Sequence, residues 1–143
     1  NFYVTDSFAA YPDQPLGYAD YDRFLDVTRG YPAVVIKDEE DGVVGFAFLR
    51  AFRTERTFSR VAEITYFIHP DHTGKGLGTR VLEDFIKAAR AQGIDTFLAN
   101  ISSRNEVSLK FHAKHGFLEC GRFRRIGRKF GKDFDVVWMQ LDL

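Results

Sequence analysis

Three glycines stand on alternate positions, Gly74, Gly76 and Gly78, after a stretch that predicts a β-strand and before a pattern that predicts an amphipathic helix. A glycine-rich turn that opens a helix suits an anion, because its backbone N–H groups converge and the helix dipole adds partial positive charge. The residue types and their spacing therefore predict a phosphate-binding turn.

Two widespread phosphate loops do not fit this turn. The P-loop needs a glycine where His69 stands and a Ser or Thr where Gly76 follows Lys75. The G-x-G-x-x-G fingerprint of dinucleotide-binding proteins also fails, because its last glycine is replaced by Thr79 or Val81, depending on the starting glycine. A different kind of phosphate site is required.

Glu63 is a candidate general base. It lies within a run that is otherwise rich in Val, Ile, Tyr and Phe, and desolvation in such a strand makes a carboxylate a better proton acceptor. Two other interpretations remain open: a solvent-facing Glu at a strand end, or a carboxylate paired with Arg53, Arg56 or Arg60.

Ser108, His112 and His115 are spaced to lie on one face of a helix. An imidazole that titrates near neutral pH can donate or accept a proton, so His112 is a candidate acid or base. The alternative is an ordinary helix histidine that makes one hydrogen bond. The sequence contains no convincing set of converging metal ligands, so no metal is expected.

The composition limits the class of protein. A chain of 143 residues, 45% hydrophobic, has the size of one domain. Twenty basic residues balance twenty acidic ones, so phosphate recognition is expected to be local rather than a property of the whole surface. The single Cys120 fits a reducing compartment, and no apolar run reaches the roughly 20 residues of a membrane span. We expect a soluble, cytoplasmic protein.

The order of the expected elements predicts an α/β domain whose sheet is partly antiparallel. A hairpin is expected with its turn at Asp41 and Gly42. Helix periodicity in Leu77, Val81, Leu82, Phe85 and Ala89 ends at Gly93. Helices are expected over 18–29, 77–92 and 103–115; strands are expected over 31–52 (two, joined by the turn), 59–70, 95–101, 117–127 and 133–143. The last helix has two rival N-terminal caps. One is Ser103, which would form a capping box with Glu106, and the other is Asn105.

Three separated motifs resemble one known family. The segment from Thr73 to Gly78 resembles the Q/R-x-x-G-x-G/A signature of the GNAT superfamily of acetyl-CoA-dependent N-acetyltransferases, with Thr73 where Gln or Arg is usual. The segment NEVSLKFHAKHGF is similar to the helix that lines the pantetheine channel in that family, and GRKFGKDFDVVWMQLDL is similar to the ending of its phosphinothricin acetyltransferase-like branch. The resemblance covers Phe8 to Leu143.

The resemblance implies a GNAT fold: a mixed, largely antiparallel twisted sheet flanked by helices, with a splay between two central parallel strands. Residues 1–143 would form a single N-acetyltransferase domain that lacks the first strand and most of the first helix of the family, which would precede Asn1. It also implies the acetyl-CoA site. The implied cofactor-binding residues are Phe67, Ile68, Thr73, Gly74, Lys75, Gly76, Leu77, Gly78, Thr79, Asn105 and Ser108.

The resemblance further implies transfer of an acetyl group from acetyl-CoA to the primary amine of a small molecule, in a ternary complex. Glu63 and His112 would be catalytic, with a backbone amide near Ile68 as the oxyanion donor. The implied acceptor is amino-acid-like, of the phosphinothricin or methionine sulfoximine type. The implied substrate-binding residues are Phe8, Arg53, Arg56 and Phe58. The alternative is a GNAT-like domain that binds or senses an acyl-CoA without turnover.

The basic run GRFRRIGRKFGK allows a second interpretation, contact with nucleic acid phosphates. A strand-turn-strand with Phe123 and Phe130 as core anchors between solvated charges is the simpler one, so no nucleic acid or membrane partner is expected. The hairpin can instead contact an acidic acceptor or a second subunit. The family branch implies a homodimer.

Overall fold

The computed structural model describes residues 1–143. Its strands are β1 (Ala33–Lys37), β2 (Val43–Ala51), β3 (Val61–Ile68), β4 (Thr96–Ser102), β5 (Leu118–Lys129) and β6 (Lys132–Asp142), in the sheet order β1-β2-β3-β4-β6-β5. Its helices are α1 (Phe2–Asp6), α2 (Tyr18–Val27), α3 (Leu77–Ala91) and α4 (Glu106–Lys114), with short 3₁₀ turns η1 (Arg56–Phe58) and η2 (Pro70–His72). The predicted α/β class is confirmed.

The chain divides into two compact units. One consists of residues 24–97 with Leu143, and the other consists of residues 1–23 with 98–142.

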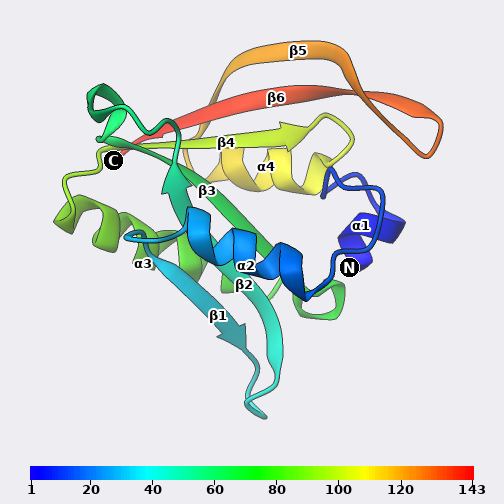
Figure 1. Cartoon of the computed structure of the whole chain (residues 1–143), viewed down its shortest axis with the longest axis horizontal. Helices are drawn as coiled ribbons and strands as arrows, with labels where there is room; N and C mark the ends of the chain where they lie inside the picture. Colours follow the sequence, from blue (N-terminus) through cyan, green and yellow to red (C-terminus); the bar gives the residue numbers. More distant parts are fainter. The chain divides into compact units, whose positions relative to one another are not determined.

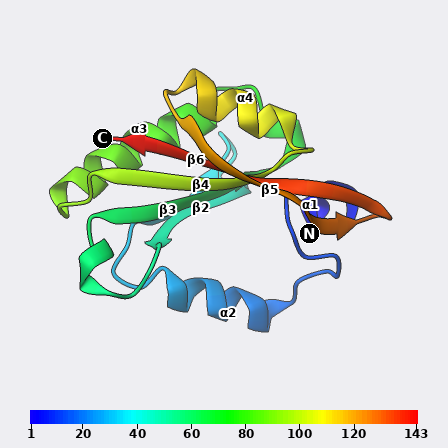
Figure 2. The same ribbon diagram turned by 90° about the horizontal axis from the view of Figure 1, so that it is seen from above.

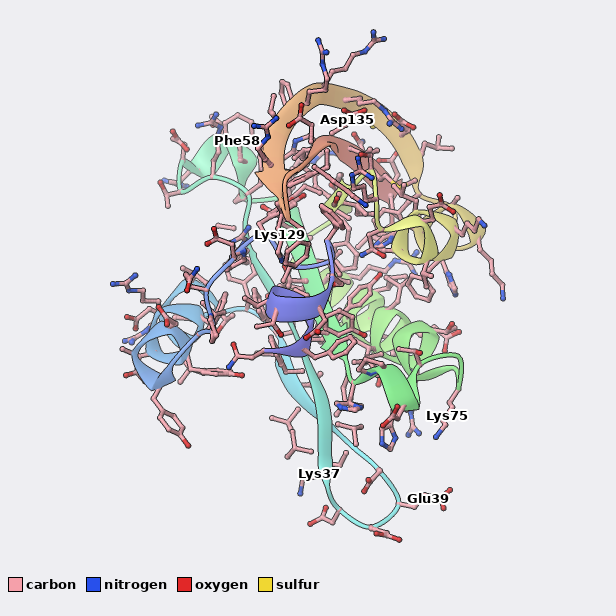
Figure 3. The ribbon with its side chains drawn as sticks, turned by 90° about the vertical axis from the view of Figure 1, so that its right-hand side faces the viewer. Lys37, Glu39, Phe58, Lys75, Lys129 and Asp135 are labelled. Carbon is pink, nitrogen blue, oxygen red and sulfur yellow. The ribbon has the colours of Figure 1, made fainter.

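Within residues 24–97, β1, β2 and β3 form an antiparallel meander. The β1–β2 turn is closed by the Asp38 carboxylate, which accepts the N–H groups of Glu40 and Gly42 at 3.0 and 2.8 Å. Asp41 adopts a left-handed conformation with φ of 65°. The predicted hairpin at Asp41 and Gly42 is therefore confirmed, and Figure 3 shows Lys37 and Glu39 at its tip.

Side chains on β2 and β3 alternate between two faces, as they must in a pleated sheet. One face carries Leu49 and Ala62, which are fully buried, and Figure 2 shows α3 on one side of β2 and β3. On β2 the other face carries Phe48, whose ring lies 5.9 Å from that of Phe24 at the end of α2. The two faces of this meander are therefore distinct, and Glu63 belongs to the face of Phe48.

The periodicity predicted for α3 is confirmed. Val81, Leu82, Phe85 and Ala89 are buried along one side of the helix. Gly93 follows the helix with φ of 77°, the left-handed conformation that a helix C-terminus favours and that glycine adopts without strain. The helix is thus bounded by left-handed glycines on both sides, Gly76 and Gly93.

In the other unit, β5 and β6 pair as a long antiparallel hairpin (Figure 1). A bulge between Phe123 and Gly127 sets extra residues of β5 against Asp135 of β6, and the Asp135 carboxylate accepts the Arg125 N–H at 2.8 Å. This backbone bond, with help from Arg122, lowers the pKa of Asp135. The carboxylate therefore holds the bulge in place, since charge-assisted bonds to backbone N–H groups are strong.

Two expectations for this unit are wrong. Phe123 and Phe130 are 57% and 51% exposed rather than core anchors. Lys129, expected as a solvated charge, is buried and its ammonium donates to the Ala10 carbonyl at 2.7 Å. Of the two rival caps for α4, Asn105 is confirmed, because its side chain accepts the Ser108 N–H.

The N-terminal segment holds a helix that no sequence pattern predicted. α1 is only five residues long, too short to show periodicity. The Asn1 side chain bridges to Leu16 through bonds of 2.6 and 3.0 Å, and Lys129 also donates to the Tyr3 carbonyl at 3.3 Å. These contacts join the segment to the end of β5.

None of the helices has both the length and the apolar character that a membrane-spanning helix needs.

Candidate active site

The glycine turn lies between η2 and α3. Gly74 and Gly76 have φ of 73° and 78°, and a Cβ added to either would meet no atom within 4 Å. Left-handed backbone at two nearly adjacent positions strongly favours glycine. The conformation, rather than lack of space, therefore explains these two glycines.

The N-terminus of α3 carries no side-chain cap. Gly76 occupies the N-cap position, so no side chain of that residue can cap the helix. The first hydrogen bond back to the turn runs from the Arg80 N–H to the Gly76 carbonyl at 3.1 Å. The first N–H groups of a helix have no intrahelical acceptor, so the turn presents main-chain donors together with the positive end of the helix dipole. Thr73 and Lys75 are exposed beside it.

The side chains of this turn leave the anion-binding role to the main chain. The Thr73 hydroxyl donates to the Pro70 carbonyl at 2.8 Å and so serves the local turn. Figure 3 shows Lys75 pointing outward from the start of α3. The residues of the turn fit a diphosphate, because they combine open space above the glycines with a helix N-terminus.

Glu63 is buried, with 6% of its surface exposed. It pairs in register with Arg50 of β2, and the Arg50 Nη2 donates to the Glu63 Oε1 at 2.8 Å. The interpretation of a solvent-facing glutamate is therefore wrong. The pairing interpretation is correct in kind, but the partner is Arg50 and none of the arginines named from the sequence.

Phe67 lies on the Glu63 face of β3, four residues further along, and its ring lies 5.6 Å from that of Phe46. Its neighbour Ile68 pairs with Gly45 of β2. A Cβ on Gly45 would lie 2.6 Å from the Phe67 carbonyl oxygen, so only glycine allows the two strands to approach at this point. The end of β3 is thus held closely against β2, immediately before the glycine turn.

The segment between β2 and β3 holds three of the four predicted substrate-binding residues, Arg53, Arg56 and Phe58. The Arg53 guanidinium lies 5.7 Å from the Phe52 ring centre, and the Phe52 and Phe58 rings meet edge to face at 5.9 Å. Arg56 is exposed and opens η1. Glu63 is the third residue of β3, so this aromatic and basic segment precedes the carboxylate and the glycine turn follows it.

His112 is the buried histidine of the other unit, only 3% exposed. Its Nδ1 lies 2.7 Å from the Ser108 carbonyl oxygen. A carbonyl only accepts hydrogen bonds, so Nδ1 carries the proton and Nε2 carries the lone pair. Burial lowers the pKa of His112 to about 4, which outweighs the opposing effect of the Ser108 bond. The side chain is therefore a neutral imidazole at pH 7.

The other predicted residues of this unit fall into two places. Asn105 and Ser108 form the first turn of α4, where the Ser108 hydroxyl lies 3.2 Å from the His112 Nδ1. Phe8 lies in an aromatic cluster with Phe130 and Phe134, at ring distances of 5.4 and 6.0 Å. The structure thus brings Asn105, Ser108 and His112 together on one helix, and it groups Phe8 with the tip of the β5–β6 hairpin.

Sequence reasoning missed Arg50. The alternation of β2 places Arg50 on the face of Phe48, but the irregular segment between β2 and β3 hides which residue lies opposite Glu63. No group of three or more His, Cys, Asp or Glu side chains is placed to hold a metal ion.

Residues 1–117 match the model of the acetyltransferase (GNAT) family. The chain is 33% identical over 142 residues to the L-methionine sulfoximine/L-methionine sulfone acetyltransferase of Pseudomonas paraeruginosa, covering 98% of this chain and 83% of the relative. It is 40% identical over 115 residues to the L-amino acid N-acyltransferase MnaT of Escherichia coli, covering 80% and 66%.

A solved structure is similar over almost the whole chain. It is a GNAT superfamily phosphinothricin acetyltransferase from Sinorhizobium meliloti in complex with AcCoA, 31% identical, with a TM-score of 0.91, covering 99% of this chain and 77% of that one.

Proposed function

The chain belongs to the GNAT family of acetyltransferases, and on that premise we propose that it transfers the acetyl group of acetyl-CoA to the primary amine of a small, amino-acid-like molecule. The observation that carries the proposal is local. A buried, ion-paired carboxylate lies on the strand that leads into an uncapped, glycine-bounded helix N-terminus. The first feature suits a general base and the second suits a coenzyme diphosphate.

Amide formation from a thioester needs a deprotonated amine. Glu63 takes a proton from the acceptor ammonium, and the amine nitrogen then attacks the thioester carbonyl carbon. The new C–N bond forms, the nitrogen gives up its second proton, the C–S bond breaks, and coenzyme A leaves as a thiolate that takes up a proton. The ion pair with Arg50 supports this role, because it holds the carboxylate in one direction.

The coenzyme is proposed to contact three sets of residues. Main-chain N–H groups of residues 73–79 would hold the diphosphate. The end of β3, at Phe67 and Ile68, would supply the donor for the oxyanion of the tetrahedral intermediate. Asn105 and Ser108 are proposed to contact the pantetheine part.

His112 is proposed to act as a neutral imidazole. With Nδ1–H bonded to the Ser108 carbonyl, the proton-accepting atom is Nε2. The lowered pKa argues against a resting imidazolium that donates a proton to the thiolate. His112 would therefore accept a proton before it could give one.

The acceptor is proposed to be an amino acid or a close analogue. The similar proteins are named for L-methionine sulfoximine, L-methionine sulfone, L-amino acids and phosphinothricin. Arg53 or Arg56 can pair with the carboxylate of such a molecule. Phe58, which is partly exposed, and Phe8 are proposed to contact its apolar part.

Thiol release from acetyl-CoA, measured over a panel of amines, tests the proposed activity. The panel contains L-methionine sulfoximine, L-methionine sulfone, phosphinothricin, common amino acids, a polyamine and a short peptide. We expect release above the amine-free background with at least one amino-acid-like amine, and none with the polyamine. Background rates throughout would contradict the proposal and favour the alternative, a domain that binds acyl-CoA without turnover.

We also propose that residues 1–143 act as one acetyltransferase domain in a cytoplasmic homodimer. Leu118, Phe123 and Ile126 on β5 are 72%, 57% and 63% exposed, and exposed apolar side chains in one hairpin suit an interface between copies. Light scattering should give twice the 16.4 kDa mass of the chain. It should give the monomer mass for Phe123→Asp, and a monomeric wild type would contradict the dimer.

A further inference from the structure

Arg50 and Glu63 form a cross-strand pair at the start of β3. They are direct partners in the antiparallel register of β2 and β3, so their side chains emerge on the same face, close enough to interact. The neighbours of Glu63 on that face of the two strands are Val61, Thr65 and Phe48, all uncharged. On these two strands, Arg50 is therefore the charged group that faces the carboxylate.

The pair is unequally exposed. The Glu63 side chain is 8% exposed and the Arg50 side chain 37% exposed, with 2.8 Å between Nη2 and Oε1. A buried carboxylate that loses its partner becomes neutral or rotates toward another donor. The exposed guanidinium has no such need, because water solvates it. The pair therefore serves the carboxylate more than it serves the arginine.

We propose that Arg50 is a positioning residue for the acetyl transfer: it fixes the direction of the Glu63 carboxylate without touching the substrate. This inference rests on the proposed function. A base works only when it is charged and aimed at the proton that it removes. Loss of Arg50 should therefore slow the chemical step and leave binding of acetyl-CoA unchanged.

The test compares Arg50→Met, Arg50→Lys and Glu63→Gln in steady-state thiol release with the best amine of the panel. We expect Arg50→Met to lower kcat about 10- to 100-fold, with the KM for acetyl-CoA within about twofold of wild type. Arg50→Lys should recover most of the loss, because lysine restores the charge. In the Glu63→Gln background, Arg50→Met should have little further effect, since residues that act as a unit are not additive.

Arg60→Met is the matched control. Arg60 makes an ion pair of the same 2.8 Å length with Asp95 in the same unit. The Arg60 side chain is 67% exposed and the Asp95 side chain is 45% exposed. We expect kcat within about twofold of wild type. An Arg50→Met enzyme with wild-type kcat, or equal losses in Arg50→Met and Arg60→Met, would overturn the inference. Absence of turnover in the wild type would instead overturn the proposed function.

Discussion

At the scale of single residues, burial acts differently on the two proposed catalytic groups. Glu63 is buried with a cationic partner, the Arg50 guanidinium. His112 is buried with a carbonyl partner, and burial lowers its pKa to about 4. For His112 the effect of burial outweighs the opposing effect of the Ser108 carbonyl, which leaves a neutral imidazole at pH 7.

The lowered pKa of His112 makes stability depend on pH. In the unfolded chain this histidine takes up a proton below about pH 6.5, whereas in the folded protein it stays neutral down to about pH 4. The unfolded state therefore binds more protons between these values, and stability falls as the pH falls through this window. From pH 7 to pH 5 we expect His112 to account for a loss of about 2 kcal/mol.

Urea unfolding of wild type and His112→Asn at pH 7 and pH 5 measures this effect. The variant should lose about 2 kcal/mol less than wild type over the same interval. His69→Asn, which removes an exposed histidine, is the control and should keep the wild-type loss. Equal losses in wild type and His112→Asn would show that this imidazole does not carry the pH dependence.

At the scale of elements, α3 is delimited by left-handed glycines. Gly76 and Gly93 have nearly equal φ, 78° and 77°, and a Cβ on either would meet no atom within 4 Å. Alanine at either position should therefore cost about 1 kcal/mol of unfolding free energy, from backbone strain alone. Chemical denaturation of Gly76→Ala and Gly93→Ala checks this, and a cost at only one of the two would contradict the shared cause.

Much of this element-level structure can be predicted from the sequence because it follows local rules. The periodicity of Val81, Leu82 and Phe85, the turn at Asp41 and the cap at Asn105 each depend on a few neighbouring residues. The sequence leaves Ser103 and Asn105 as rival caps, because tertiary structure decides between them. Ser103 accepts the Asp135 N–H at 2.9 Å instead of capping α4, and Asp135 is distant in the sequence.

At the scale of the whole molecule, what escaped prediction is non-local. Lys129 looks like one more charge in a basic run, but it is buried against carbonyls of Tyr3 and Ala10, more than 100 residues away in the chain. Arg50 opposes Glu63 across an irregular segment whose length does not reveal the register. The candidate glycine turn and the candidate base can be proposed from the sequence, because a motif and a local environment mark them. Their partners cannot, because pairing depends on the folded sheet.

The proposed function requires that the turn at the start of α3 binds acetyl-CoA. The separation expected between the two central parallel strands, which would admit the thioester, stays a prediction. Gly76→Ala changes the main chain at the proposed diphosphate site, and Gly93→Ala applies the same strain at the opposite end of the same helix. The two variants therefore separate a loss of the site from a loss of stability.

Calorimetric titration of acetyl-CoA into wild type, Gly76→Ala and Gly93→Ala, each folded at the working temperature, is the most direct test. The predicted result is binding by wild type, binding within about twofold of that by Gly93→Ala, and binding at least about tenfold weaker by Gly76→Ala, a difference of about 1.4 kcal/mol. Equal affinity in all three proteins, or no binding by wild type, would contradict the binding of acetyl-CoA at this turn.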